Sequence, residues 1–345
     1  MRFVSLSVGL LGAASITDAY PGMRQTMSQL MSFKKRAPEP RQLLGDLIDL
    51  PFEELTHVGR HIRAILLLEN TNGGGQDLAT IYEVPGPLDS PECAAETCCL
   101  WHYIVEEMVA DFSGSSGRCN MLARQAVRLG FHDAGTWSKE GGGGADGSFV
   151  LANEIERPLN AGLEEINEKM KQYYETWNPY GASMADLIQM GANVGAVVCP
   201  MGPRVRSFVG RNDSSTPAPE GRLPAATQDV EELLELFEAK TIDRGDLITL
   251  LGAHSVGQQR FEDPARSGDP HDTTPGVWDA IPFYEQTVSN DTAKRIFKFH
   301  SDVSVATYPD SLPLWGLFAT PDVGQSFWND VGSDCFRLQS QHTNS

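Results

Sequence analysis

The chain has 345 residues, a net charge of −19 and a hydrophobic fraction of 41%. This length and apolar content provide enough core for one large domain or two small ones. The excess of acidic side chains repels phosphate, which argues against a nucleic-acid partner and against an anionic membrane surface.

The chain begins MRFVSLSVGLLGAASITDAY, where an early arginine, a short apolar run and small residues form the pattern of a secretory signal. The apolar run is too short to cross a bilayer, and no later run is long enough. We therefore expect a secreted, extracellular protein whose signal occupies residues 1–19, with cleavage after Ala14 or Ala19. The basic stretch KKR at 34–36 would end a propeptide at 20–36, although an exposed basic patch explains it equally well.

Residues 37–91 contain one helical-looking stretch followed by glycine- and proline-rich sequence, so we interpret them as an N-terminal extension before a folded domain at 92–345. An even number of cysteines in an exported chain indicates disulfides. The glycosylation sequons at Asn212 and Asn290 support export only weakly. All six cysteines follow the extension, at Cys93, Cys98, Cys99, Cys119, Cys199 and Cys335.

Apolar residues recur at helical spacing throughout the predicted domain, while strand-like alternation is scarce. Asp229 and Glu232 have the spacing of a capping box, and Asn290 is a plausible helix cap. These patterns predict a mainly α domain with long loops. The predicted helices lie at 97–112, 119–133, 161–174, 183–198, 229–240, 246–257 and 290–303.

The stretch RLGFHD places Arg128 and His132 four residues apart, on one face of a helix, whereas Asp133 points elsewhere. A glycine run ending in Ala-Asp-Gly-Ser follows at 141–148. Taken alone, the Arg–His pair is more often a satisfied core histidine beside a surface arginine.

Three further stretches carry chemistry-bearing side chains. His254 lies in LLGAHSVG, at the end of an apolar helix. The stretches GADGS and DTTPGVWD place oxygen donors around tight turns, which suits a hard cation such as Ca²⁺. Ordinary turns around glycine and proline explain the same residues.

Together, RLGFHD, GGGGADGS, LLGAHSVG and DTTPGVWD occur in an order that resembles the secreted fungal haem peroxidases, class II of the plant–fungal–bacterial peroxidase superfamily. The resemblance runs from about Cys93 to Cys335. It implies the plant-type peroxidase fold, in which two helical halves sandwich haem b. A C-x-x-C-H attachment motif is absent from the sequence, so the haem would be held without covalent bonds.

The resemblance implies a role for each residue near the haem. His132 would be the base that moves a proton between the two oxygens of H₂O₂. Arg128 would stabilise the charge on the leaving oxygen, and Asn160 would fix the tautomer of the base. Phe131 would pack at the haem face. On the opposite face, His254 would bind the iron and Asp302 would accept a hydrogen bond from it.

The resemblance also implies two structural calcium ions and three disulfides. Each ion would clamp a helix end that carries a haem-facing histidine. The first ion would be bound by Asp133, Gly144, Asp146 and Ser148, and the second by Ser255, Asp272, Thr274, Val277 and Asp279. The implied disulfides are Cys93–Cys99, Cys98–Cys335 and Cys119–Cys199, although six cysteines by themselves allow 15 pairings.

The chain departs from its lignin-attacking relatives at two sites. Where manganese-oxidising members carry three acids, this sequence has Met121, Gln125 and Arg260, so we expect no Mn²⁺ oxidation there. Where other members carry an exposed tryptophan before the iron ligand, this sequence has Thr249. Trp137 near the distal helix could offer another electron route, although ordinary packing explains it better.

We therefore expect a monomeric peroxidase that uses H₂O₂ to oxidise small phenolic and aromatic reductants at the haem edge, through a ferryl intermediate. One alternative is a secreted protein that binds haem and calcium without significant turnover; it would not need a base and a cation above the iron. A non-haem metal hydrolase is a third possibility, but it needs His132 and His254 in one coordination shell.

Overall fold

The computed structural model describes residues 50–55, 60, 82–205, 207–321, 324–326 and 328–329. The chain forms two compact units, Met1–Gln42 and Leu43–Ser345, and every described residue belongs to the second. The predicted signal and propeptide lie outside the described residues, as does most of the extension at 37–91. Their boundaries, and a domain start near residue 92, stay predictions.

One group of helices comprises α4 (Pro91–Ala94), α5 (Thr97–Phe112), α6 (Met121–Ala134), α8 (Glu164–Trp177) and α9 (Met184–Val198). Among the described elements α6 packs most extensively on α9, because glycines let the two backbones approach. A Cβ added at Gly130 would lie 2.4 Å from Cβ of Ala192, and one added at Gly195 would lie 2.6 Å from the Ala123 carbonyl oxygen. This contact holds rigid the helix that carries Arg128 and His132.

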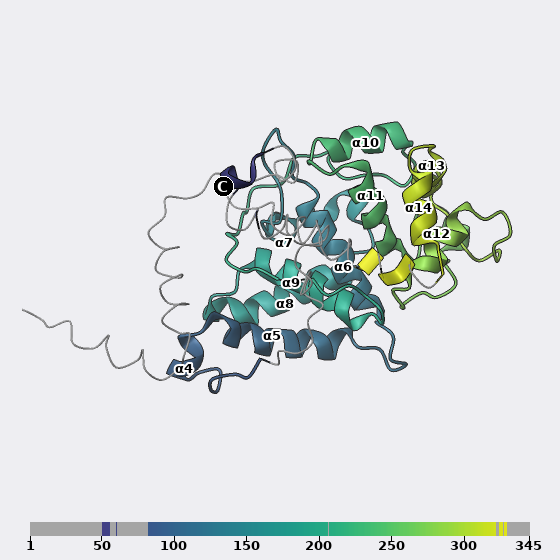
Figure 1. The fold of residues 1–345 in the computed structure, drawn as a ribbon. Coiled ribbons are helices and arrows are strands. Elements are labelled where there is room, and N and C mark those ends of the chain that lie inside the picture. The colour runs from purple at the N-terminus through teal and green to yellow at the C-terminus, as the bar shows by residue number, and fades with distance from the viewer. Residues whose placement is uncertain are drawn as a thin grey trace, which may run out of the picture. The chain divides into compact units, whose positions relative to one another are not determined.

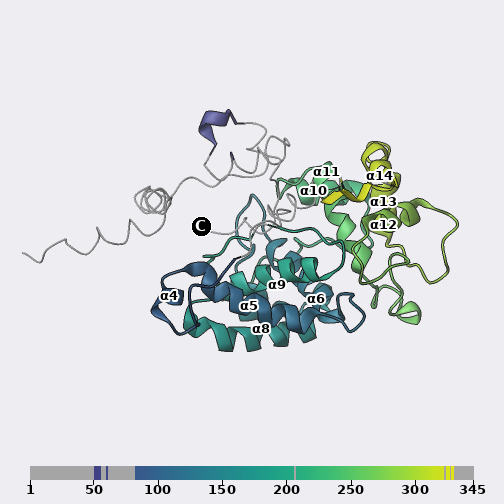
Figure 2. The same cartoon turned by 60° about the horizontal axis from the view of Figure 1, so that its bottom comes forward.

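A second group comprises α10 (Val230–Glu238), α11 (Arg244–Leu251), α12 (Ala280–Val288), α13 (His300–Thr307) and α14 (Leu312–Phe318), with η6 (Gly252–Val256) continuing α11. Figures 1 and 2 show α10 to α14 gathered on one side of the unit, away from α5 and α8. Helix α12 contacts η6, α13 and α14. Its side chains Phe283 and Tyr284 pack against Trp315 of α14, at tilted and edge-on angles, in a fully buried aromatic core.

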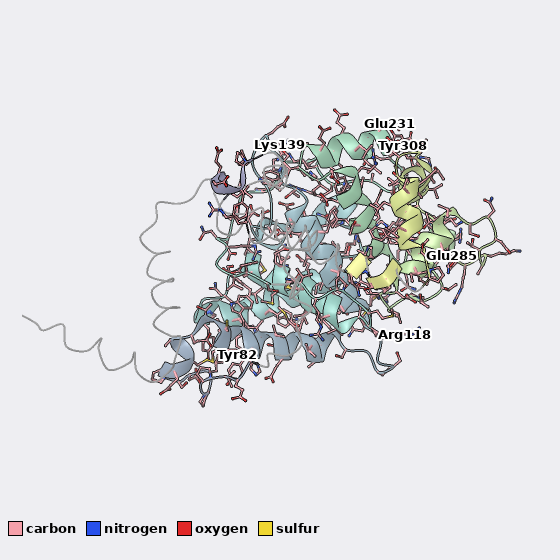
Figure 3. The ribbon with its side chains drawn as sticks, in the orientation of Figure 1. Tyr82, Arg118, Lys139, Glu231, Glu285 and Tyr308 are labelled. Atoms are coloured by element: carbon pink, nitrogen blue, oxygen red, sulfur yellow. A yellow bond between two sulfur atoms is a disulfide. The ribbon has the colours of Figure 1, made fainter. Side chains whose placement is uncertain are left out.

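Short elements connect these helices: η1 (Phe52–Glu54), α7 (Ser148–Leu151), η3 (Glu154–Glu156), η4 (Pro158–Asn160), η5 (Asn178–Tyr180) and η7 (Pro264–Arg266). Figure 3 shows the side chains in the same view, with Glu231 and Tyr308 near α10 and Tyr82 at the α4 end. The described residues contain no strand, only two isolated bridges, at Ser113–Cys119 and Gln258–Pro270. The predicted mainly α class is therefore confirmed.

Local sequence signals explain where most helices begin. The Asn120 side chain caps α6 through the Ala123 N–H, and Ser183 caps α9 through the Asp186 N–H. The predicted capping box of Asp229 and Glu232 is present at the start of α10. No helix among the described residues is both long and apolar enough to cross a membrane.

The helix predicted at 290–303 is wrong for its first ten residues, because α13 begins only at His300. Within this segment the backbone forms a turn, in which the Ile296 N–H donates to the Ala293 carbonyl, and other bonds run to a different loop. The Phe297 N–H donates to the Pro270 carbonyl, and the Arg266 side chain donates to the Ile296 carbonyl. These long-range bonds replace the helical ones that the local pattern indicated.

Two of the three expected disulfides are confirmed. Cys93 pairs with Cys99, and Cys119 pairs with Cys199. Cys98 is an exposed free thiol among the described residues, and its expected partner Cys335 lies outside them. The third pairing therefore stays a prediction.

Candidate functional site

Arg128 and His132 lie on the same face of α6, as their spacing predicts. The Arg128 Nε–H donates to Nε2 of His132 at 3.2 Å. The two terminal nitrogens of the guanidinium donate to the carbonyl oxygens of Ala161 and Leu159, at 2.8 and 2.7 Å. The arginine is therefore held by the backbone of η4 and of the residue after it, with its charge directed at the histidine.

Asn160 sets the tautomer of His132. Its amide nitrogen donates to the Glu154 carbonyl at 2.7 Å, which turns its Oδ1 towards the histidine. That oxygen lies 2.7 Å from Nδ1 of His132, so Nδ1 carries the proton and Nε2 keeps a lone pair. Burial, followed by the charge of Arg128, lowers the pKa of His132 to about 3. The imidazole is therefore neutral near pH 5 to 7 and is able to accept a proton at Nε2.

His254 lies on η6, and its Nδ1 is 3.1 Å from both carboxylate oxygens of Asp302 on α13. Asp302 is only 1% exposed, so this pair is shielded from water. Burial alone lowers the pKa of His254, but the charge and hydrogen bond of Asp302 outweigh it and raise the pKa. No described residue hydrogen-bonds the Nε2 of His254, which leaves that nitrogen for a metal.

The surroundings of His254 leave room for a cofactor beside its imidazole. The side chain keeps 36% of its surface accessible although its carboxylate partner is buried. The charge of Arg128 also acts on the pKa of His254, so the two histidine sites are electrostatic neighbours. Phe131 lies beside His132, with ring centroids 6.0 Å apart, and stacks on Phe237. His254 would hold the iron of a haem, with the Asp302 carboxylate hydrogen-bonded to this ligand, and His132 would stay free to move a proton.

The first predicted calcium loop gathers its oxygen donors around the end of α6. The Asp133 carboxylate accepts the N–H groups of Gly147 and Phe149, both at 3.2 Å. Asp146 accepts the Ser148 N–H at 3.0 Å, while the Gly144 N–H is tied to Thr136, which itself donates to the Asp133 carbonyl. Burial, followed by the charge of Asp146, raises the pKa of Asp133. A cation between the two carboxylates would relieve this repulsion.

The second predicted calcium loop is closed by hydroxyl groups. The Ser255 hydroxyl donates to Asp272 at 2.7 Å, and the Thr274 hydroxyl lies 2.7 Å from Asp279. Burial raises the pKa of Asp272 to about 6, and the charge of Asp279 adds to this. The Val277 N–H donates to the Thr274 carbonyl. Four of the five residues expected as ligands thus lie in the loop at 272–279, and Ser255 reaches this loop from η6.

Neither loop holds enough carboxylates to bind an ion by itself. In the ranges that the structure describes, no three His, Cys, Asp or Glu side chains are placed to hold a metal. Each calcium ion would therefore need the hydroxyl and carbonyl oxygens of its loop as well, and such oxygens are common calcium ligands.

The residues at the predicted manganese position are neighbours in space. Nη2 of Arg260 lies 3.3 Å from the Met121 sulfur, on the first turn of α6. Thr249, at the position of the relatives' exposed tryptophan, is fully buried. All tryptophans of the chain are buried as well, Trp137 at 6% exposure and Trp177, the most exposed of them, at 8%.

Two residues near the site were missed by sequence reasoning. Glu154, which is 3% exposed, orients Asn160 through its carbonyl and holds Arg157 and the Ala218 N–H through its carboxylate. His271 packs behind His254, with ring centroids 5.7 Å apart, and its Nδ1 contacts the Phe297 carbonyl at 2.9 Å. The sequence signal for His271 was its position directly before the predicted ligand Asp272; Glu154 has no comparable signal.

Comparisons with known proteins agree on one family. The family model described as peroxidase matches residues 105–319. "Ligninase C" of Trametes versicolor is 35% identical over 281 residues, covering 78% of this chain and 68% of that protein. "Ligninase LG2" of Phanerodontia chrysosporium is 33% identical over 200 residues, covering 55% and 53%. "Peroxidase" of Arthromyces ramosus is 31% identical over 242 residues, covering 68% and 63%. The chain thus spans about half the length of the Phanerodontia ligninase that it matches.

Proposed function

The chain belongs to the peroxidase family, in its fungal class II branch, and from this premise we propose that it is a haem peroxidase that reduces H₂O₂ with electrons from small aromatic donors. The observation that carries the proposal is the contrast between the two histidines. His132 is hydrogen-bonded to an amide and stays neutral, whereas His254 is hydrogen-bonded to a carboxylate. A proton-shuttling base needs the first environment and a ligand of an oxidising iron needs the second.

On the distal side, His132 would act at its Nε2 atom. When bound, the haem would supply the iron that accepts peroxide and stores its oxidising equivalents. Nε2 of His132 would take the proton from the near oxygen of peroxide and return it to the far oxygen, which leaves as water. Arg128 would offset the negative charge that develops on that leaving oxygen.

On the proximal side, His254 would bind the iron through Nε2. Asp302 would keep the proton of His254 on Nδ1 and increase the electron donation of the imidazole. Phe131 would form part of the apolar wall at the haem face. The two calcium ions would be structural, because each loop joins the end of a helix that carries one of the histidines.

Small phenols and aromatic amines fit this site as reductants. Two phenol molecules would each give one electron and one proton, so that 2 ArOH + H₂O₂ gives 2 ArO• + 2 H₂O. The Mn²⁺ route is disfavoured because Arg260 stands where a cation would bind. Direct oxidation of bulky high-potential aromatics is disfavoured because every tryptophan of the chain is buried.

We further propose that the protein is secreted, glycosylated and monomeric. The N-terminal signal pattern, the two sequons and the two disulfides support export. Residues Asn212 and Asn290 would carry the glycans.

The test is a panel of H₂O₂-dependent oxidations with the haem-loaded protein. We expect turnover of a simple phenol, no saturable turnover of Mn²⁺ and little turnover of a non-phenolic aromatic of high potential. Tight, saturable Mn²⁺ turnover would refute the predicted specificity. A haem absorption spectrum that H₂O₂ does not change would refute the peroxidase activity and leave a haem-binding protein.

A further inference from the structure

Two arginines that the proposed peroxide chemistry does not use lie next to Arg128. Arg124, Arg128 and His132 follow one another at intervals of four residues, so they share one face of α6. Arg124 Nη1 donates to Gln258 Oε1 at 2.7 Å, which ties α6 to the segment after His254. Arg260, from that same segment, reaches back to Met121 on the first turn of α6. The two guanidinium groups therefore meet at the junction of α6 and residues 256–260.

Neither arginine has an acidic partner among the described residues. Arg124 donates to the Asn120 and Val256 carbonyls and to the Gln258 amide, all of them uncharged. Within the described part of the chain, Arg260 donates to the Met121 sulfur alone, and its side chain is exposed. Burial, followed by the charge of Arg260, lowers the pKa of Arg124, so the two cations repel each other. The chain carries 46 acidic residues against 27 basic ones, so two adjacent arginines without a carboxylate are unusual in it.

Exposed apolar side chains lie beside Arg260 and beside Arg128. Phe261, Leu159 and Met121 are exposed at 56%, 43% and 40%. A Cβ added at Gly162 would lie 2.8 Å from the Phe261 ring and 3.5 Å from Nη1 of Arg128. An aromatic ring is therefore exposed beside the distal arginine, and Leu159 lies at the same place because its carbonyl accepts from Arg128. Cations beside exposed apolar groups complement a ligand with a ring and an anionic group.

We propose that Arg124 and Arg260 form a carboxylate-binding site at the entrance to the distal pocket, and that aromatic acids with a phenolic group are preferred reductants. This inference rests on the proposed peroxidase function and names its substrate class. The carboxylate would lie against the two guanidinium groups and the ring against Phe261 and Leu159. The carboxylate would stay ionised, while the phenol group alone would give up one electron and one proton.

The haem itself carries propionate groups, which offer the same chemistry to these arginines. The test must therefore separate an external carboxylate from one that belongs to the cofactor. Matched ligands make this separation. Benzoate and benzamide have the same ring and nearly the same shape, but only benzoate carries a negative charge. The same contrast in charge holds between 4-hydroxycinnamate and its methyl ester.

The first measurement is calorimetric binding of benzoate and benzamide to the haem-loaded protein. We expect Arg260→Gln to raise the dissociation constant of benzoate roughly three- to ten-fold and to affect benzamide less, as the loss of a charged hydrogen bond requires. Arg260→Lys should retain part of the affinity because it keeps the charge. Arg124→Gln should act in the same direction as Arg260→Gln. The matched control is Arg244→Gln, an exposed arginine on α11 whose partner is Asp310.

The second measurement is the ratio of kcat/KM for 4-hydroxycinnamate to that for its ester. We expect this ratio to fall roughly three- to ten-fold in Arg260→Gln and to fall in high salt. The proposal would be overturned if Arg260→Gln left the kcat/KM ratio unchanged and if the unaltered protein bound benzoate no more tightly than benzamide. The proposal would also be overturned if Arg260→Gln released haem to apomyoglobin faster while the kcat/KM ratio stayed constant. The arginines would then hold a haem propionate and not an external carboxylate. If neither phenol is oxidised, the peroxidase function fails, and the benzoate affinities still decide whether the site exists.

Discussion

His132 and His254 carry the same side chain, yet their partners at Nδ1 give them opposite protonation behaviour. An amide oxygen 2.7 Å from Nδ1 of His132 adds no charge, so burial dominates and the pKa falls to about 3. A buried carboxylate at 3.1 Å from His254 outweighs burial and raises the pKa. At the scale of single residues, this difference between Asn160 and Asp302 is what supports the proposed roles, proton transfer for His132 and metal binding for His254.

Replacement of the proposed base tests the distal assignment. His132→Leu keeps the volume but removes the lone pair at Nε2, so the reaction with H₂O₂ should slow by about 10²–10⁴-fold or more. Stopped-flow absorption of the haem band measures this rate. The haem band before peroxide is added should match that of the unaltered protein, which controls for folding. A variant that reacts with peroxide at the native rate would show that another group is the base.

Replacement of Asp302 tests the proximal assignment. Asp302→Asn removes the charge beside His254, so ferric iron should be less stabilised and the reduction midpoint should rise. The loss of a charged hydrogen bond corresponds to a rise of roughly 60–130 mV. Spectroelectrochemical titration of the haem measures it. An unchanged or lower midpoint would contradict the assigned role.

Because Lys240 is buried, we expect the free energy of unfolding to rise with pH. Its ammonium group is buried and donates to the Trp137 carbonyl at 3.1 Å. Burial, and then the charge of Arg222, lowers its pKa to about 8. Between this value and the unfolded pKa near 10.4 the unfolded chain binds more protons, so the free energy of unfolding rises with pH, by about 3 kcal/mol in total. Urea unfolding from pH 7.5 to 10.5 should show this slope, and Lys240→Met should flatten it, whereas Lys171→Met on the surface should not.

At the scale of elements, the distal helix is positioned by contacts at both of its ends. The disulfide Cys119–Cys199 joins the segment before α6 to the end of α9, and glycines along both helices permit their close packing. At its other end, α6 runs into the loop of Asp133, whose carboxylate is held by the Gly147 and Phe149 N–H groups. The Arg124 bond to Gln258 then connects α6 to the segment after η6. The arginine thereby ties α6 to the end of η6.

The two disulfides should differ in their contribution to stability. Cys119 and Cys199 are 80 residues apart, whereas Cys93 and Cys99 are six apart. Loop entropy predicts losses of about 4.5 kcal/mol for the long loop and about 2.4 kcal/mol for the short one. Urea unfolding of the Cys119→Ser/Cys199→Ser and Cys93→Ser/Cys99→Ser double variants compares them directly. Equal losses, or a larger loss for the short loop, would mean that native strain dominates over loop entropy.

At the scale of the whole molecule, calcium should support both halves of the site together. If each ion is present at 100 times its dissociation constant, each contributes about 2.7 kcal/mol to stability. Chelation should therefore lower the thermal midpoint and speed the release of haem. Metal analysis should find two ions, with one lost in Asp146→Ala and one in Asp279→Ala. Two ions retained in either variant would show that these loops do not bind calcium.

Much of the fold follows from local sequence signals. The capping box at Asp229 and the apolar periodicity of 97–112 predicted α10 and α5, because caps and amphipathic faces depend on neighbours within one or two turns. The helix predicted for 290–299 is absent because hydrogen bonds to Pro270 and Arg266 outweigh the local helical pattern of this segment. The contributions of Glu154 and His271 were missed because each acts through a partner that the chain brings close only by folding.

The sequence by itself determined the helical content, the four-residue spacing that places Arg128 and His132 on one face of a helix, and the family to which the chain belongs. Through its family resemblance the sequence also pointed to Asn160 as the partner of His132 and to Asp302 as the partner of His254. Only the tertiary structure decided that the Glu154 carbonyl holds Asn160, that His271 packs behind His254, and that Arg124 meets Arg260 without an acid between them. Spacing along one helix is set by its 3.6-residue turn and can be read from the chain. Contacts between distant segments depend on how the buried surfaces pack, and that packing belongs to the folded molecule as a whole.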